Sequence, residues 1–250
     1  MSIHAIEKAE INMNNQEDKS AEHIYKDKSY LNNNENWHQE DSPYKGSFVQ
    51  KAINRNKVSF NTCVDIGCGA GLVTEIIAKN YSKSNIKGCD FSPDAKPFWN
   101  HRTKLDNLEF SSTDVTSETE IYDLVVCLDV FEHVEDYYSF LRSVKKVGRK
   151  FIFNIPLDMN VMKVLTNGIK YARTEVGHLH YFSEYTALET LKDCGFKIED
   201  SFLSTAFLGV PPRNIRQLAA LPFRLTTLVL GKSIGARIFG GQSLVVYAES

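Results

Sequence analysis

From Val58 onward, short apolar runs alternate along the chain with stretches that have a helical pattern. Strands are predicted over residues 62–67, 85–90, 108–114, 122–129 and 150–156, and helices over residues 72–81 and 136–147. Strands that alternate with helices form βαβ units, which build a mostly parallel sheet with helices on its faces. The pattern therefore predicts an α/β fold with a doubly wound sheet.

The last third of the chain adds one helix and two strands to this prediction. The helix begins after Ser183, a good N-cap residue, and ends at Gly195, a typical stop signal. Residues 196–202 and 243–249 resemble a final antiparallel pair of strands. We therefore expect a seven-stranded sheet that is mostly parallel, with an antiparallel last strand.

The 250 residues divide unequally by composition. Residues 1–57 are rich in asparagine and charge and poor in aliphatic side chains, which predicts a tail. The run from Tyr44 and Phe48 into VQKAI predicts a short helix before the first strand, so we assign residues 1–57 as an N-terminal tail and lid helices. Residues 58–250 fit a single domain, because 42% of the chain is hydrophobic and a sizeable core can form. Two long connections are expected as inserts, near 157–177 and 203–242, and such connections usually carry substrate-facing elements.

Charge and cysteine content bear on partners and compartment. Lys and Arg number 29 against 31 Asp and Glu, a net charge of −2, so no basic excess indicates a nucleic-acid partner. Five cysteines without a close CxxC pair are typical of reduced thiols in a cytoplasmic protein. The N-terminus has no signal-peptide pattern, and charges and a proline interrupt the apolar segment 218–239, so we expect no transmembrane segment.

A glycine-rich loop, Val64-Asp-Ile-Gly-Cys-Gly-Ala-Gly71, joins the first predicted strand to the first helix. In such a loop, glycines allow a tight turn and let a ligand approach the backbone closely. A dinucleotide-binding fingerprint would place its third glycine at position 72, which is leucine here. The loop disfavours an NAD-dependent oxidoreductase, although by itself it could be a structural turn.

Acidic residues close the next three predicted strands. Asp90 follows Gly71 by 19 residues, near the ~20 residues expected for an acid that binds ribose hydroxyls. Asp114 and Asp129 close the third and fourth strands. The carboxyl ends of parallel strands line the crevice in which such sheets bind ligands. Each acid alone could simply cap a helix, but together with the glycine loop they predict a ligand site.

These segments resemble a known family. VDIGCGAG, GCDFSP, TDV and YDLVVCLDVFEHV are similar to successive motifs of the class I S-adenosylmethionine-dependent methyltransferases. HLHYFSEYTALETLKDCGF resembles a late motif of their ubiquinone-biosynthesis-like, small-molecule branch. The resemblance implies a Rossmann-like fold, S-adenosyl-L-methionine as the methyl donor and S-adenosyl-L-homocysteine as the product.

The resemblance also implies roles for individual residues. The methionine moiety of the donor would be surrounded by five loop residues: Asp65, Gly67, Cys68, Gly69 and Gly71. Asp90 would hold the ribose hydroxyls, and Phe91, Asp114 and the main-chain N–H of Val115 would contact the adenine. Further donor contacts would come from Leu128 and Asp129, and, in the N-terminal segment, from His38 and Lys45.

Histidines are the candidate catalytic bases. Methyl transfer from a sulfonium is an in-line displacement whose main requirement is alignment, and a base is needed only for a protonated acceptor. His133 follows the fourth strand, and His178 and His180 precede the last helix. We predict His133 and His178 as the catalytic candidates, with packing roles as the alternative. Two histidines at i, i+2 without a nearby third ligand do not predict a metal site.

We therefore predict an enzyme that transfers a methyl group from S-adenosylmethionine to a small-molecule acceptor. The alternatives are a non-catalytic subunit that only binds the donor and a macromolecule methyltransferase. Against nucleic acid as the substrate, the Asn/Asp-Pro-Pro-aromatic signature of base methylation is absent after the fourth strand. Residues 218–239 either form helices that cover the sheet edge or provide an amphipathic surface for a lipid-like acceptor, a membrane or a partner. The acceptor and the oligomeric state are left open.

Overall fold

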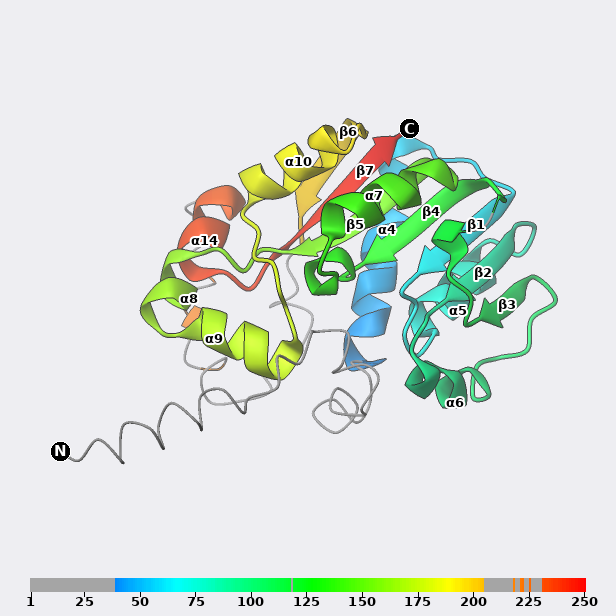
Figure 1. Cartoon of the computed structure of the whole chain (residues 1–250), viewed down its shortest axis with the longest axis horizontal. Coiled ribbons are helices and arrows are strands. Elements are labelled where there is room, and N and C mark those ends of the chain that lie inside the picture. Colours follow the sequence, from blue (N-terminus) through cyan, green and yellow to red (C-terminus); the bar gives the residue numbers. More distant parts are fainter. Residues whose placement is uncertain (1–38, 118, 205–217, 219–220, 223–224, 226–230) are drawn as a thin grey trace, which may run out of the picture.

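A computed structural model describes residues 39–117, 119–204, 218, 221–222, 225 and 231–250. His38 and most of the segment 218–239 lie outside these residues. Within them the chain forms a twisted central sheet with helices on both faces. The sheet does not close into a barrel, so its two outermost strands are edge strands (Figure 1).

The sheet has seven strands in the order β3-β2-β1-β4-β5-β7-β6. They are β1 (Thr62–Ile66), β2 (Asn85–Cys89), β3 (Leu108–Ser111), β4 (Tyr122–Leu128), β5 (Gly148–Pro156), β6 (Lys197–Leu203) and β7 (Ser243–Glu249). β3, β2, β1, β4 and β5 pair in parallel, whereas β7 lies antiparallel between β5 and β6. The predicted fold class is confirmed, including the antiparallel last strand.

In the described part of the chain, one helix precedes β1 and the others lie in the connections between the strands. They are α4 (Ser42–Asn56), α5 (Leu72–Asn80), α6 (Lys96–Trp99), α7 (Tyr137–Lys146), α8 (Val161–Leu165), α9 (Gly168–Tyr171), α10 (Glu184–Asp193) and α14 (Lys232–Phe239). Short helical turns include η3 (Val115–Ser117) and η4 (Phe131–His133). The insert predicted near 157–177 holds α8, α9 and the turn Ala172–Val176.

Alternation along the strands divides the core into two layers. On one face, Val125 and Phe153 pack with Leu141 of α7 and Leu191 of α10. On the other face, buried strand residues pack against α4 and α5. Successive side chains of a strand point to opposite faces, so strands covered on both faces are apolar throughout.

Part of the segment expected to be tail and lid belongs to this core. Val49, Ala52 and Ile53 of α4 are buried against α5 and the sheet. Arg55 at the end of α4 forms a two-pronged hydrogen bond with Asp200 of β6, at 2.8 Å from each nitrogen. The domain boundary that we place at residue 58 stays a prediction.

One strand ends earlier than expected. β3 stops at Ser111, where the Ser111 and Thr113 hydroxyls are hydrogen-bonded at 2.9 Å. Asp114 therefore lies in a turn beyond the strand, where its Oδ1 accepts from the backbone N–H of Thr116 at 3.0 Å. A side chain that hydrogen-bonds the backbone two residues ahead competes with strand pairing, which explains the early end.

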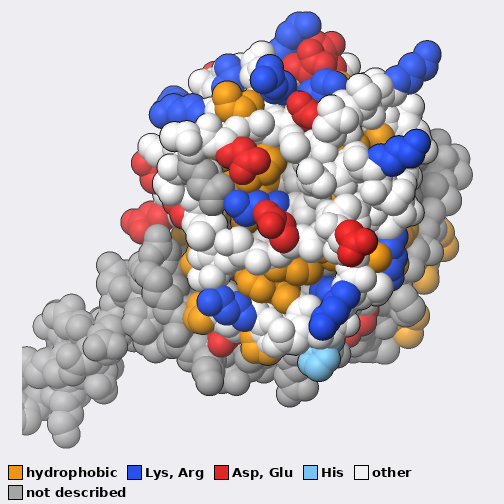
Figure 2. Space-filling model, turned by 90° about the vertical axis from the view of Figure 1, so that its right-hand side faces the viewer, with side chains coloured by type: hydrophobic (Ala, Val, Ile, Leu, Met, Phe, Trp, Pro, Cys, Tyr) orange, Lys and Arg blue, Asp and Glu red, His pale blue; other side chains and the backbone are white. Residues whose placement is uncertain are grey.

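The surface at the β3 edge is mixed in character. Figure 2 shows this face, where Lys and Arg side chains are interspersed with Asp and Glu around a small apolar area. Among the described residues, no helix is both long and apolar enough to cross a membrane.

Candidate active site

The glycine loop between β1 and α5 is held in a conformation that favours glycine. Gly67, Gly69 and Gly71 have φ values of 72°, 52° and 77°. A Cβ atom on Gly67 would lie 2.5 Å from Cγ2 of Val130, which follows β4. The loop is therefore packed directly against the carboxyl end of the neighbouring strand β4, as the strand order requires.

Four backbone N–H groups of this loop donate hydrogen bonds to acceptors within the protein. Those of Gly67 and Cys68 both donate to the carbonyl of Cys89, at 2.8 and 3.1 Å, and that of Gly71 donates to Cys68 at 2.9 Å. The Gly69 N–H donates to Oδ2 of Asp90 at 2.8 Å. A loop that binds pyrophosphate directs its N–H groups at the phosphates. Because these four groups already have acceptors, the loop suits a ligand without phosphate, which argues against a dinucleotide.

Two buried carboxylates lie beneath the loop. Asp65 accepts a hydrogen bond from the Thr74 hydroxyl at 2.6 Å, and Oδ1 of Asp90 accepts from the Ser92 N–H at 2.8 Å. Burial raises the pKa of Asp65 to about 7, and the charge of Asp90 adds to the shift. Burial also raises the pKa of Asp90. Buried carboxylates of this kind favour a cationic or hydroxyl-bearing ligand that supplies compensating contacts.

The residues expected near an adenine lie at the ends of β2 and β3. The Phe91 side chain is 56% exposed, although it directly follows the buried Asp90. Asp114 is exposed, and the side chain of Val115 is buried. The Phe91 side chain is therefore reachable from solvent next to Asp90, and the contacts with adenine that the resemblance implies for Phe91, Asp114 and Val115 stay predictions.

Trp99 and Phe110 support the loop, and the sequence did not single them out. Trp99 donates from Nε1 to the carbonyl of Gly69 at 2.8 Å, and its ring stacks on Phe110 with centroids 5.3 Å apart. A Cβ atom on Gly71 would lie 2.5 Å from the Phe110 ring. Trp99 stands in a connection without strong periodicity, so only its residue type could have drawn attention to it.

The end of β4 is tied to the N-terminal part of the chain. Lys45 of α4 forms an ion pair with Asp129, at 2.5 Å between Nζ and Oδ2. Asn154 of β5 donates to Oδ1 of Asp129 at 2.6 Å. Asp129 has a φ of 54°, whereas Leu128 before it is still in the strand and is partly buried in the core. Lys45 and Asp129 thus meet at the carboxyl edge of the sheet, next to the glycine loop.

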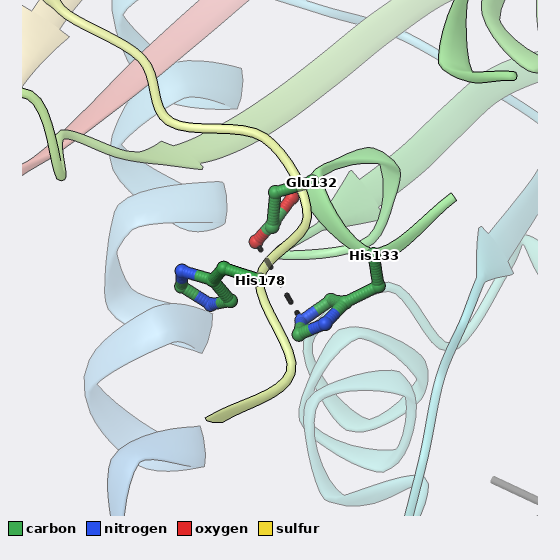
Figure 3. Close-up of side chains that lie close together, drawn as sticks. All are labelled: Glu132, His133 and His178. Atoms are coloured by element: carbon green, nitrogen blue, oxygen red, sulfur yellow. Dashed lines mark ion pairs between the residues drawn. The ribbon is translucent and has the colours of Figure 1, made fainter. Parts of the chain in front are cut away.

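A second cluster lies just beyond Asp129. Phe131 is fully buried, and the main-chain carbonyl of Glu132 accepts from the N–H groups of Leu179 and His180, at 2.8 and 3.1 Å. These bonds bring the segment before α10 against η4. As a result, one potential ligand atom from each of Glu132, His133 and His178 lies within 4.8 Å of the other two (Figure 3).

Both predicted catalytic histidines belong to this cluster. Nδ1 of His133 is 3.0 Å from the carbonyl oxygen of Gly177, and Nδ1 of His178 is hydrogen-bonded to a carboxylate oxygen of Asp158. Burial and the neighbouring His178 lower the pKa of His133 to about 3. His180 is held apart, with Nε2 3.0 Å from the carbonyl oxygen of Val134. Catalysis by His133 or His178 stays a prediction.

Glu132 is a further residue that the sequence reasoning missed. Its side chain is 0% exposed, and burial followed by the charge of Asp129 raises its pKa well above the usual range. A charged residue type in the apolar turn between Phe131 and Val134 was the available signal, because buried glutamates are rare unless paired.

A separate depression of about 620 Å³ lies between α7 and α10, and it contains none of the predicted donor residues. Its lining includes Tyr138, Tyr181 and Tyr185.

The comparisons with known proteins bear on this arrangement. A family model described as a methyltransferase domain matches residues 37–201, which is more than half of the chain. The chain belongs to this family. The resemblance to class I S-adenosylmethionine-dependent methyltransferases is confirmed, and the matched range of the methyltransferase domain includes α4.

Individual relatives of the methyltransferase domain are distant. A ubiquinone biosynthesis O-methyltransferase from Rickettsia canadensis is 26% identical over 157 residues, which cover 58% of this chain and 66% of the relative. A (S)-coclaurine N-methyltransferase from Thalictrum flavum is 29% identical over 91 residues, 34% of this chain and 25% of the relative. The chain therefore spans less than two thirds of the length of these relatives.

Solved structures share the fold. The magnesium protoporphyrin IX methyltransferase from Synechocystis, solved with bound S-adenosylhomocysteine, aligns with a TM-score of 0.54 at 18% identity. The alignment covers 85% of this chain and 84% of that one. A coclaurine N-methyltransferase, solved with N-methylheliamine and S-adenosylhomocysteine, aligns with a TM-score of 0.55 at 17% identity, over 81% of this chain and 72% of that one. At such identities the likeness shows a common fold.

Proposed function

We propose that this chain is a methyltransferase that takes a methyl group from S-adenosylmethionine and transfers it to a small molecule. The observation that carries the proposal is the glycine loop of β1, packed on Val130 and flanked by the buried Asp65 and Asp90 at the carboxyl edge of the sheet. The family to which the chain belongs and the relatives named above support it.

The residues present fit this donor. S-adenosylmethionine has no phosphate, which agrees with a loop whose four N–H groups are bonded within the protein. It carries a cationic ammonium and a sulfonium, which the buried carboxylates would balance. Each Asp90 oxygen accepts one hydrogen bond from the backbone, which leaves lone pairs for the two ribose hydroxyls.

Alignment is the main contribution expected from the protein. When bound, the donor supplies a methyl group on a sulfonium leaving group. The glycine loop would hold the methionine end, Asp90 the ribose, and Phe91 the adenine. The Lys45–Asp129 ion pair would fix the wall of the site between α4 and β4. Holding the reacting atoms in line can lower the barrier by ~7–11 kcal/mol.

A small acceptor is favoured over a macromolecule. The relatives named above are enzymes of ubiquinone and coclaurine metabolism. The face shown in Figure 2 mixes both signs of charge, whereas a nucleic-acid surface gathers Lys and Arg in a stripe. The net charge of −2 agrees with this reading.

Donor binding provides the first test. Isothermal titration calorimetry with S-adenosylhomocysteine should show one site on the wild-type chain, weakened about tenfold to a hundredfold by Asp90→Ala, because two hydrogen bonds to a charged group are lost. Phe91→Ala should also weaken binding, and it leaves the loop's hydrogen bonds in place. Asp106→Ala is the matched control, since this exposed acid precedes β3 at the opposite edge of the sheet.

Turnover separates the enzyme from a subunit that only binds the donor. Release of S-adenosylhomocysteine would be measured with a panel of small phenols, carboxylates and amines. Turnover with a member of the panel supports the proposal. Tight donor binding with no turnover on any of them would favour the non-catalytic alternative, and no donor binding at all would contradict the proposal itself.

A further inference from the structure

Buried carboxylates are normally paired or hydrogen-bonded, and the side chain of Glu132 departs from this rule. Neither of its side-chain oxygens has a hydrogen-bond partner on any other residue that the structure describes, although the side chain is 0% exposed. Burying a carboxylate without a compensating partner is unfavourable, so an unpartnered buried carboxylate is rare in folded proteins and needs an explanation. Nε2 of His133 lies 4.0 Å from its Oε1.

In the two histidines beside Glu132, the Nδ1 atom of each ring is held by a contact with another residue. Nδ1 of His133 is held by the carbonyl of Gly177, and Nδ1 of His178 by Asp158, whose other oxygen pairs with Lys163. Burial raises the pKa of Asp158, but the hydrogen bond from His178 and the charge of Lys163 outweigh it and hold the value at about 2. Histidines that bind metals almost always donate their other ring N–H to a carboxylate or a backbone carbonyl.

From this arrangement we propose that Glu132, His133 and His178 form a binding site for a divalent transition-metal cation such as Zn²⁺. Two imidazole nitrogens and one carboxylate, with a further position open, are a common donor set of catalytic zinc sites. Their ligand atoms lie within 4.8 Å of one another, near the spacing of about 3.4 Å in a tetrahedral site with bonds of ~2.1 Å. Small side-chain rotations would close the difference, and Figure 3 shows the three side chains close together, with the Glu132 carboxylate directed toward the His133 ring.

The site adjoins the proposed donor site. Asp129, which pairs with Lys45, is near enough to influence the pKa of Glu132, and Val130 between them contacts the glycine loop. A cation here balances the negative charge of Glu132. Its open position accepts an oxygen or nitrogen atom of the methyl acceptor, and this use, unlike the metal binding itself, rests on the proposed function.

Metal binding is tested on the full chain after treatment with a chelator. Calorimetry with Zn²⁺ should show one site per chain, and Zn²⁺ should raise the melting temperature. Co²⁺ should give visible absorption bands typical of a coordinated site. Glu132→Gln and His178→Ala should each weaken Zn²⁺ binding at least about tenfold and remove the Co²⁺ bands, because each deletes a ligand.

His101→Ala is the control, because this exposed histidine lies after α6 and outside the cluster, so it should bind Zn²⁺ as the wild type does. Circular dichroism verifies that each variant is folded, and Glu132→Gln keeps the volume of the side chain if His178→Ala does not fold. Unchanged Zn²⁺ binding in the folded Glu132→Gln variant would overturn the proposal, as would no binding by the wild type. Binding of S-adenosylhomocysteine is measured separately, so failure of the metal site and failure of the proposed function give different results.

Discussion

At the scale of single residues, Asp65 gives a prediction that depends on its burial. Its pKa is about 7 in the folded chain, against ~3.9 for an exposed aspartate. The folded state therefore holds a proton that the unfolded state loses above pH 4, and the contribution of Asp65 to stability decreases as pH rises toward 7. Asp65→Asn removes this effect. Relative to the wild type, the variant should gain roughly 2 kcal/mol in unfolding free energy between pH 5 and pH 8. Urea titrations at both pH values measure the difference, and parallel pH dependences of the two proteins would contradict the assignment.

At the scale of elements, the start of α10 is set by a local signal, the N-cap residue Ser183. Ser183 accepts from the backbone N–H of Thr186 at 3.2 Å, and the Thr186 hydroxyl accepts from the N–H of Ser183 at 2.9 Å. Loss of this reciprocal cap in Ser183→Ala should cost about 1 kcal/mol, whereas Ser183→Asn, which can still cap, should cost only a few tenths. Denaturant unfolding of the two variants tests this. Equal losses would show that the cap does not stabilise α10.

At the scale of the whole molecule, the sheet depends on its last strand. β7 pairs with β5 over its whole length and with β6 from Leu244 to Glu249, and it contributes Leu244 and Val246 to one core layer and Val245 to the other. Removal of residues 243–250 leaves both neighbours with unpaired edges and opens both layers. We expect this truncated chain to lose its cooperative unfolding transition, measured by thermal circular dichroism. Deletion of residues 1–36, which lie outside the family match, should preserve it. A cooperative transition in the chain without β7 would contradict this view of the sheet.

Local patterns predicted the elements well because each strand and helix carries its own periodicity. The bounds of β4 and β7 and the start of α10 follow directly from apolar runs and a capping serine. β3 was predicted too long, since the turn formed by Ser111, Thr113 and Asp114 depends on hydrogen bonds that periodicity does not show.

The sequence by itself determined the fold class, the glycine loop and the acids Asp90 and Asp129 that directly follow their strands. Each of these features depends only on the spacing of residues along one strand and the loop after it. Only the tertiary structure decided which distant residues meet. It placed Lys45 of α4 on Asp129, Trp99 on Gly69 and His178 beside Glu132, across 46 positions of chain. The physical reason is that burial and pairing belong to the packed molecule. A glutamate in the turn after β4 has no unusual local pattern, and it becomes a candidate ligand only when two histidines are packed against it.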